Sequence, residues 1–117
     1  MIAAIIQARM ESTRFPGKVL KQINGLSLLE FQIERVKKSK KIKRIIVASS
    51  KNKSDDQIEK LCLQKNIDYY RGSEDDVLSR YYECANIYKI ETVVRLTADC
   101  PLIDPIIIDK VVELFLK

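Results

Sequence analysis

The sequence predicts an α/β fold in which a parallel sheet is covered by helices on both faces, as a three-layer sandwich. Three observations lead to this prediction. The length of 117 residues fits one domain with one apolar core. Strand-like and helix-like segments alternate in the order βαβαβαβα, and the first strand candidate is a continuous apolar run, typical of a strand buried on both faces. We therefore expect one domain over residues 1–117, with ligands beyond the carboxyl ends of the strands.

The strand candidates are short segments rich in aliphatic and β-branched residues. Residues 2–8, "IAAIIQA", and residues 44–49, "RIIVAS", are predicted as buried strands. Residues 67–71, "IDYYR", and residues 92–97, "TVVRLT", are predicted as the third and fourth strands. No repeat or Pro/Gly/Ser-rich linker interrupts this order, so no domain boundary is expected.

The helix candidates follow the strands and carry start signals. The segments at residues 27–38 and 54–65 each begin with a capping box, in which a serine and a Glu or Gln three residues later bond each other's backbone N–H groups. These pairs are Ser27 with Glu30, and Ser54 with Gln57. Ser73 is expected to cap the third helix, within residues 75–90. In the last helix we expect Asp104 as N-cap and Pro105 at the first helical position.

Composition narrows the class of protein. With 46% hydrophobic and 32% charged residues, the chain is expected to fold. Its apolar runs are too short to span a bilayer and no secretory leader opens it, which favours a cytoplasmic protein without a membrane partner. Three widely spaced cysteines and no histidine argue for reduced thiols rather than disulfides or a zinc site. These cysteines are Cys62, Cys84 and Cys100.

The net charge of +5 is concentrated in one segment, residues 35–44, "RVKKSKKIKR", which has seven cations and no acid. No aromatic residue interrupts the segment to stack on bases. We expect a solvated helix end whose cations complement the helix dipole, and no nucleic-acid partner.

The loop after the first strand, "QARMESTRFPGKVL", has an unusual set of donors. It brings Arg9, Arg14 and Lys18 together with hydroxyls such as Ser12. Guanidinium forks, a lysine point charge, hydroxyls and free backbone N–H groups are the donors that bind polyphosphates. Neither the Walker spacing nor Gly-x-Gly-x-x-Gly is present. From the residues alone, a phosphate site and a basic surface loop without a ligand both stay open.

Four segments in order resemble the cytidylyltransferase family, which includes spore-coat-polysaccharide biosynthesis proteins and, more distantly, the CMP-Kdo and acylneuraminate synthetases. They are "IIQARMESTRFPGKVL", "RIIVASS", "RGSEDDVLSRY" and "RLTADCPLIDP", and together they cover nearly the whole chain. The resemblance implies the nucleotide-diphospho-sugar transferase (glycosyltransferase-A-like) fold. It also implies transfer of CMP from CTP to a sugar or sugar acid, with release of pyrophosphate, for surface polysaccharide biosynthesis.

The same resemblance implies roles for residues of the first loop. Ala8 and Arg9, with the backbone beside them, would lie against the nucleotide. Ser12, Arg14 and Lys18 would hold its phosphates.

Two residues outside this loop also match the family. Arg71 would approach the pyrimidine base, although a surface arginine after an edge strand is nearly as good an interpretation. Asp99 would bind Mg²⁺, which bridges phosphate oxygens, although an aspartate before Cys100 and Pro101 is otherwise typical of a turn. Catalysis would then consist of positioning CTP and of sharing the leaving group's charge. Arg9, Arg14, Lys18 and the Asp99-bound cation would share it.

The resemblance stops short at the carboxyl end, because relatives continue well past Lys117. The expectation is therefore a truncated fold, the amino-terminal half of a longer catalytic domain. Two other functions stay open. One is a sugar-nucleotide-dependent glycosyltransferase, which needs an Asp-x-Asp motif of which "ADC" supplies only one acid. The other is a truncated, non-catalytic nucleotide-binding module. An incomplete sheet would expose an edge and an apolar face, so homodimerisation is a hypothesis.

Overall fold

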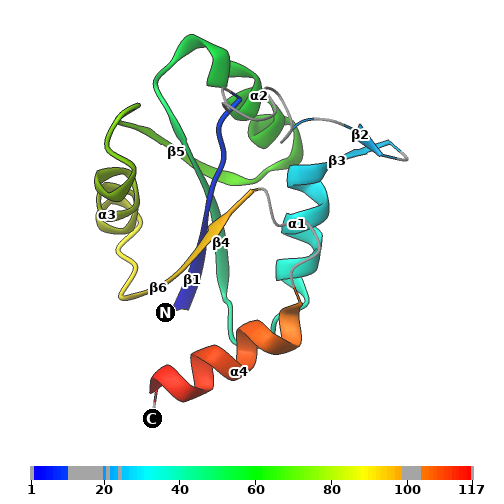
Figure 1. Ribbon diagram of the computed structural model, residues 1–117, viewed down its shortest axis with the longest axis vertical. Coiled ribbons are helices and arrows are strands. Elements are labelled where there is room, and N and C mark those ends of the chain that lie inside the picture. The colour runs from blue at the N-terminus through cyan, green and yellow to red at the C-terminus, as the bar shows by residue number, and fades with distance from the viewer. Residues whose placement is uncertain (1, 11–19, 21, 24, 99–103, 117) are drawn as a thin grey trace.

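The computed structural model describes residues 2–10, 20, 22–23, 25–98 and 104–116. Strands and helices alternate along the chain, as predicted (Figure 1). The elements are β1 (Ile2–Gln7), β2 (Gln22–Ile23), β3 (Leu26–Ser27), α1 (Leu28–Lys37), β4 (Arg44–Ser50), the 3-10 turn η2 (Lys53–Asp55), α2 (Asp56–Lys65), β5 (Asp68–Gly72), α3 (Val77–Ile87), β6 (Thr92–Thr97) and α4 (Pro105–Leu116).

The four predicted strands form one parallel sheet in the order β5-β4-β1-β6. The most apolar strand, β1, is central, and its four middle residues are buried. It pairs with β4 on one side and β6 on the other, so both faces and both edges of β1 are covered. All four strands run in one direction, and their carboxyl ends therefore meet at one end of the sheet.

Helices cover both faces of the sheet, which confirms the three-layer prediction. Alternate residues of β1 point to opposite faces, as the pleat requires. Ile6 packs with α1 and α2, and Ala4 packs with α1 and α4. Ile5 packs on the other face, against α3. Figure 1 shows α3 alone on one side of the sheet and α1 and α4 on the other.

Two of the predicted helix starts are confirmed. Ser27 and Glu30 form the complete capping box at the start of α1. Asp104 accepts the N–H of Ile106 at 2.8 Å, and Pro105 is the first residue of α4.

The two other predicted starts are wrong. Helix α2 begins at Asp56, and no side chain among the described residues caps it. The Ser54 hydroxyl donates to the side chain of Asn52 instead of accepting a helix N–H. A turn of 3-10 helix, η2, precedes α2. Asn52 caps this turn, because its side-chain oxygen accepts the Ser54 N–H. Helix α3 is capped by Asp76, whose side chain accepts the N–H of Ser79 at 2.9 Å. Ser73 instead accepts the N–H of Asp76, before the helix begins.

A small hairpin of β2 and β3 was not expected from the sequence. Its two-residue strands pair antiparallel and stand apart from the main sheet (Figure 1). Gly25 lies in the turn with φ of +87°, a conformation that side chains with a Cβ rarely adopt. Pairs this short give almost no periodic signal, which is why pattern analysis missed them.

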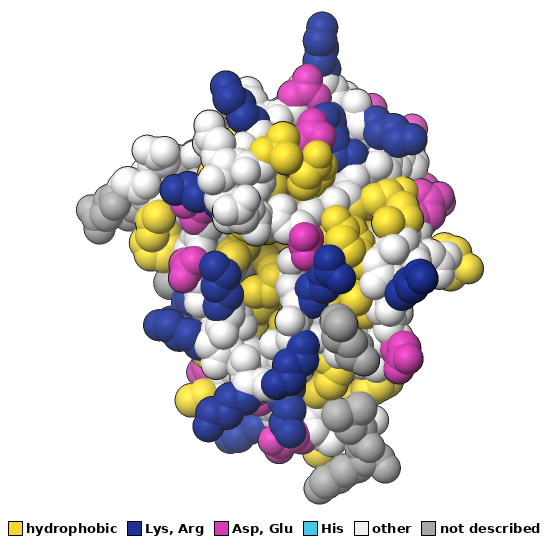
Figure 2. All heavy atoms as spheres, turned by 180° about the vertical axis from the view of Figure 1, so that it is seen from behind, with side chains coloured by type: hydrophobic (Ala, Val, Ile, Leu, Met, Phe, Trp, Pro, Cys, Tyr) yellow, Lys and Arg dark blue, Asp and Glu magenta, His cyan; other side chains and the backbone are white. Residues whose placement is uncertain are grey.

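The cation-rich segment, residues 35–44, spans the end of α1, its connection to β4 and the first residue of β4. The backbone N–H groups of Lys40 and Lys41 donate to Asp109 of α4 at 2.9 and 3.0 Å, and the Ser39 hydroxyl donates to the same carboxylate. Seen from behind, basic side chains gather in the lower half of the molecule (Figure 2). The segment therefore has a structural role: it fastens α4 to the end of α1.

Among the helices that the structure describes, none is both long and apolar enough to cross a membrane.

Ser27→Ala is expected to lower the free energy of unfolding by about 1 kcal/mol, because it removes the capping box of α1. Urea denaturation measures the change. Ser54→Ala is the matched control and should cost less than half as much, since Ser54 does not cap α2. Equal losses in both variants would contradict this assignment of the two helix starts.

Candidate functional site

The two segments predicted to form the site leave the sheet from neighbouring strands. Gln7 at the end of β1 pairs with Thr97 at the end of β6. The ladder continues one step further, since the Ala98 N–H donates to the carbonyl of Gln7 at 2.9 Å and the Ala8 N–H donates to that of Ala48 at 2.9 Å. The chain before Arg9 and the chain before residue 99 therefore lie side by side at the carboxyl end of the sheet.

Three of the predicted site residues lie in the described part of the chain. Ala8 is 1% exposed, so it offers its backbone rather than a side chain. Arg9 follows it directly and is half-buried, and Arg71 lies on the edge strand β5. Ser12, Arg14, Lys18 and Asp99 lie outside the described residues, and their roles stay predictions.

Asp55 organises this end of the sheet and was not singled out from the sequence. Its carboxylate is 1% exposed. One oxygen accepts the Met10 N–H at 2.7 Å, and the other accepts the Ser50 N–H at 3.1 Å and the Ser50 hydroxyl. Asp55 therefore ties the start of the loop after β1 to the end of β4. The available signal was a pair of aspartates, Asp55 and Asp56, directly after a buried strand.

Arg71 is held by its own surroundings. Its guanidinium donates to the carbonyls of Ser50 and Asn52 at 2.8 and 2.7 Å. It also pairs with Asp56 at 2.7 Å and with Glu59 at 3.0 Å. Burial lowers the pKa of Arg71, but the hydrogen bonds to these two carboxylates outweigh it and raise the pKa above its usual value. In this structure Arg71 joins β5 to the start of α2, and its contact with a pyrimidine base stays a prediction.

Side chains from both helical layers fix the last residues of β6. Gln32 of α1 donates to the carbonyl of Thr97 at 2.8 Å. The hydroxyl of Tyr81, on α3, donates to the carbonyl of Leu96 at 2.9 Å. Tyr81 is 5% exposed and packs in the core. The strand that leads to Asp99 is thus held from both faces.

A second arginine at this end of the sheet was also missed. Arg80 of α3 is fully buried, and its side chain packs against Gly72 at the end of β5. A Cβ built on Gly72 would lie 2.8 Å from Arg80 Cγ and 2.7 Å from the Tyr70 ring, so only glycine leaves room here. In sequence, Arg80 appears on the helix beside Tyr81 with no sign that it points inward.

The described cysteines are free thiols, as predicted. Cys62 and Cys84 are both free and buried. Burial, with a smaller contribution from the charge of Glu59, raises the pKa of Cys62 to about 12. Burial also raises the pKa of Cys84 to about 11, so neither is a thiolate at neutral pH. Cys100 lies outside the described residues.

Among the described residues, no group of three or more metal-ligating side chains gathers. Asp55 is a carboxylate at the correct end of the sheet, but hydrogen bonds from Met10 and Ser50 already occupy both of its oxygens.

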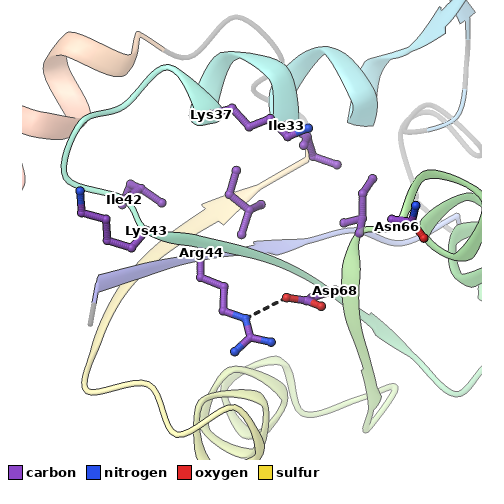
Figure 3. A pocket seen from close by; sticks show the side chains of 9 residues that line it. Ile33, Lys37, Ile42, Lys43, Arg44, Asn66 and Asp68 are labelled. Atoms are coloured by element: carbon purple, nitrogen blue, oxygen red, sulfur yellow. Dashed lines mark hydrogen bonds and ion pairs between the residues drawn. The ribbon is translucent and has the colours of Figure 1, made fainter.

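A cavity of about 370 Å³ lies at the opposite end of the sheet, where β4 and β5 begin. In Figure 3, Ile33 and Lys37 reach toward it from α1, while the Arg44–Asp68 ion pair lies on the α3 side of β4. The guanidinium of Arg44 also lies over the ring of Tyr88. The cavity is remote from the carboxyl ends of the strands, so it is not part of the candidate site.

The chain is similar to curated proteins over nearly its whole length. It is 45% identical over 116 residues to an uncharacterised protein of Methanocaldococcus jannaschii, which covers 99% of this chain and 48% of that protein. It is 37% identical to the spore coat polysaccharide biosynthesis protein SpsF of Bacillus subtilis, over 96% of this chain and 48% of that protein. It is 32% identical to a 3-deoxy-manno-octulosonate cytidylyltransferase of Trichlorobacter lovleyi, with 98% and 45% covered. The chain spans about half the length of the curated relatives it matches.

Solved structures agree with this similarity. A cytidylyltransferase from Leptospira borgpetersenii superposes with a TM-score of 0.92 at 41% identity, over 98% of this chain and 48% of that one. A CMP:2-keto-3-deoxy-manno-octonic acid synthetase solved with CTP has a TM-score of 0.73 at 21% identity, over 96% and 46%, and shares the fold. The family model described as cytidylyltransferase matches residues 3–117. The chain therefore belongs to the cytidylyltransferase family.

Proposed function

We propose that this chain is the amino-terminal, nucleotide-binding half of an enzyme that transfers CMP from CTP to a sugar or sugar acid, releasing pyrophosphate, for surface polysaccharide biosynthesis. The observation that carries the proposal is the pairing of β1 with β6, which puts the chain before Arg9 beside the chain before residue 99 at the carboxyl end of the sheet. The family match over residues 3–117 supports the choice of CTP. The names of SpsF and of the octulosonate cytidylyltransferase support a carbohydrate acceptor.

In this proposal the chain's own residues bind and orient the triphosphate. The backbone at Ala8 and Arg9 lies against the nucleotide, while Ser12, Arg14 and Lys18 donate to phosphate oxygens. Mg²⁺ bound at Asp99 would supply charge neutralisation at the phosphates. The acceptor hydroxyl attacks the α-phosphate in line and pyrophosphate leaves, so positioning and charge do most of the catalytic work and no covalent intermediate is needed.

The exposed face of α4 supports the half-domain interpretation. Ile108 and Val112 of this helix pack in the core. Five further apolar side chains of the helix are 58–73% exposed: Ile106, Ile107, Val111, Leu114 and Phe115. Contiguous exposed apolar surface of this kind marks a surface that another element covers. In the proposal the remaining half of the enzyme packs here, and homodimerisation through the same face is the alternative.

The proposal places the reaction in the cytoplasm.

Thermal-shift and calorimetric titrations of the 117-residue chain with CTP, UTP and ATP in the presence of Mg²⁺ test the proposed nucleotide. CTP at 100 times its Kd should raise the free energy of unfolding by about 2.7 kcal/mol, because only the folded chain binds it. UTP and ATP should have little effect. Stabilisation by UDP-sugars instead would favour the interpretation as a glycosyltransferase. Stabilisation by none of these ligands would favour the interpretation as a non-catalytic module.

A further inference from the structure

Arg80 is a buried cation whose guanidinium has no hydrogen-bond acceptor among the described residues. Its side chain is 0% exposed, and it is the largest of the fully buried side chains. Among the residues that the structure describes, no atom accepts a hydrogen bond from its Nε, Nη1 or Nη2. A guanidinium carries five N–H donors and stays charged in proteins, so such burial is strongly unfavourable unless an anion is supplied.

The charges around Arg80 relieve this cost only in part: Asp55 and Asp76 favour its charged form, but burial and Arg9 outweigh them. Burial lowers the pKa of Arg80, and the positive charge of Arg9 lowers it further. Asp55 is close enough to act in the opposite direction, but its oxygens accept from Met10 and Ser50 and not from Arg80. Arg9 and Arg80 therefore both lie at the carboxyl end of the sheet. The Asp55 carboxylate nearby accepts hydrogen bonds from backbone N–H groups and not from Arg80.

The fold makes room for the guanidinium at this place. Gly72 ends β5 and lets the stem of Arg80 approach the strand to within contact of its backbone. The backbone N–H of Arg80 donates to the carbonyl of Asp76 in the first turn of α3, so the side chain starts near the end of the helix that faces the site. A buried arginine that is held in place and lacks its anion is preorganised for a ligand that brings one.

We propose that Arg80 is a further nucleotide-binding residue, whose guanidinium donates to phosphate oxygens of the bound triphosphate together with Arg9. This inference rests on the proposed function, because it takes CTP as the source of the anion. It adds a residue from α3 to a site otherwise built from the loops after β1 and β6. Planar guanidinium forks match pairs of phosphate oxygens, which explains why arginine stands here in spite of its burial.

Arg80→Met tests the proposal, since methionine keeps an unbranched apolar stem and removes the charge. The free variant should melt at the same temperature as the wild-type chain or higher, because an unpaired buried charge is lost. Its affinity for CTP and for inorganic pyrophosphate, measured by calorimetry, should fall about tenfold to a hundredfold. CMP is titrated alongside: a smaller loss for CMP assigns the contact to the β- and γ-phosphates, and an equal loss assigns it to the α-phosphate.

Two further variants make the result specific. Arg80→Lys keeps the charge but loses the fork, and it should recover part of the affinity. Arg44→Met makes the same exchange at the amino end of β4, where Arg44 pairs with Asp68, and it should leave both affinities unchanged.

The outcomes separate the two proposals. A wild-type chain that binds neither CTP nor pyrophosphate overturns both. A wild-type chain that binds them, with Arg80→Met binding equally well, overturns the role of Arg80 alone. A free Arg80→Met chain that melts lower or does not fold overturns it too, because Arg80 would then have a partner within the protein.

Discussion

Replacing Asp55 with alanine is expected to lower the free energy of unfolding by about 3 kcal/mol or more. The change leaves the N–H groups of Met10 and Ser50 without their acceptor in a buried setting, and each such loss costs about 1–3 kcal/mol. Against a typical total of about 5–15 kcal/mol, this is a large fraction of the stability of the domain. The melting temperature should fall by about 10 °C or more.

Chemical denaturation with a matched control measures this effect. Asp75→Ala removes an exposed carboxylate and should change the free energy of unfolding by no more than about 0.5 kcal/mol. Asp55→Asn should lower the free energy of unfolding by an amount between those of the two alanine variants. The amide keeps one acceptor oxygen but replaces the other oxygen with an NH₂ group, which cannot accept a hydrogen bond. If Asp55→Ala melted together with Asp75→Ala, the carboxylate would not be the tie between β1 and β4.

The same variant also connects stability to the site. Asp55 holds the N–H of Met10, the residue directly after Arg9, so it sets where the loop leaves β1. In conditions where Asp55→Ala is still folded, CTP binding should therefore be weaker than in Asp75→Ala. Asp55 acts through the loop and does not itself contact the nucleotide in this proposal.

Lys18→Ala and Asp99→Asn are each expected to slow CMP transfer roughly a hundredfold or more, with little change in melting temperature. Each removes one electrostatic contact with the charge that develops on the leaving pyrophosphate, and contacts of this kind have effects of that size. Turnover is followed as pyrophosphate release. In the 117-residue chain, calorimetry should show Mg²⁺–CTP binding at least about tenfold weaker.

Charge-matched controls distinguish these contacts from general electrostatics. Lys40→Ala removes an exposed lysine of the cation-rich segment, and Asp75→Asn removes an exposed carboxylate. Both should leave CTP binding unchanged. Wild-type rates in Lys18→Ala and Asp99→Asn would remove these two residues from the proposed mechanism, whatever the family membership of the chain.

The fold was predictable from the sequence to the level of elements and layers. Continuous apolar runs in residues 2–8 and 44–49 could be buried only within a parallel sheet, and the helices between them followed from 3.6-residue periodicity. Capping at Ser27 and Asp104 was also predictable, because each side chain bonds a neighbour in sequence. The predictions at Ser54 and Ser73 were wrong because the helices begin later than expected: Asn52 caps a 3-10 turn before α2, and Asp76 caps α3.

The candidate site was predictable only in part. The hydrogen-bond donors between Arg9 and Lys18 could be recognised in the sequence. The resemblance to the family then predicted that they bind a nucleotide. Asp55 and Arg80 were not visible, because the features that single them out are contacts over long sequence distances. Asp55 bonds Met10, 45 residues away, and Arg80 packs against a glycine on a different element.

The amino-acid sequence alone determined that this protein is an α/β domain and, through its resemblance, that it belongs to the cytidylyltransferase family. Phosphate binding by the loop after its first strand stays a prediction. The sequence could determine this much because hydrophobic periodicity, caps and local donor sets are written in neighbouring residues. Only the tertiary structure decided that β1 lies between β4 and β6, that Asp55 fastens the loop, and that Arg80 is buried beside it. Strand order and side-chain burial depend on how distant segments pack, and a linear pattern carries no direct record of that packing.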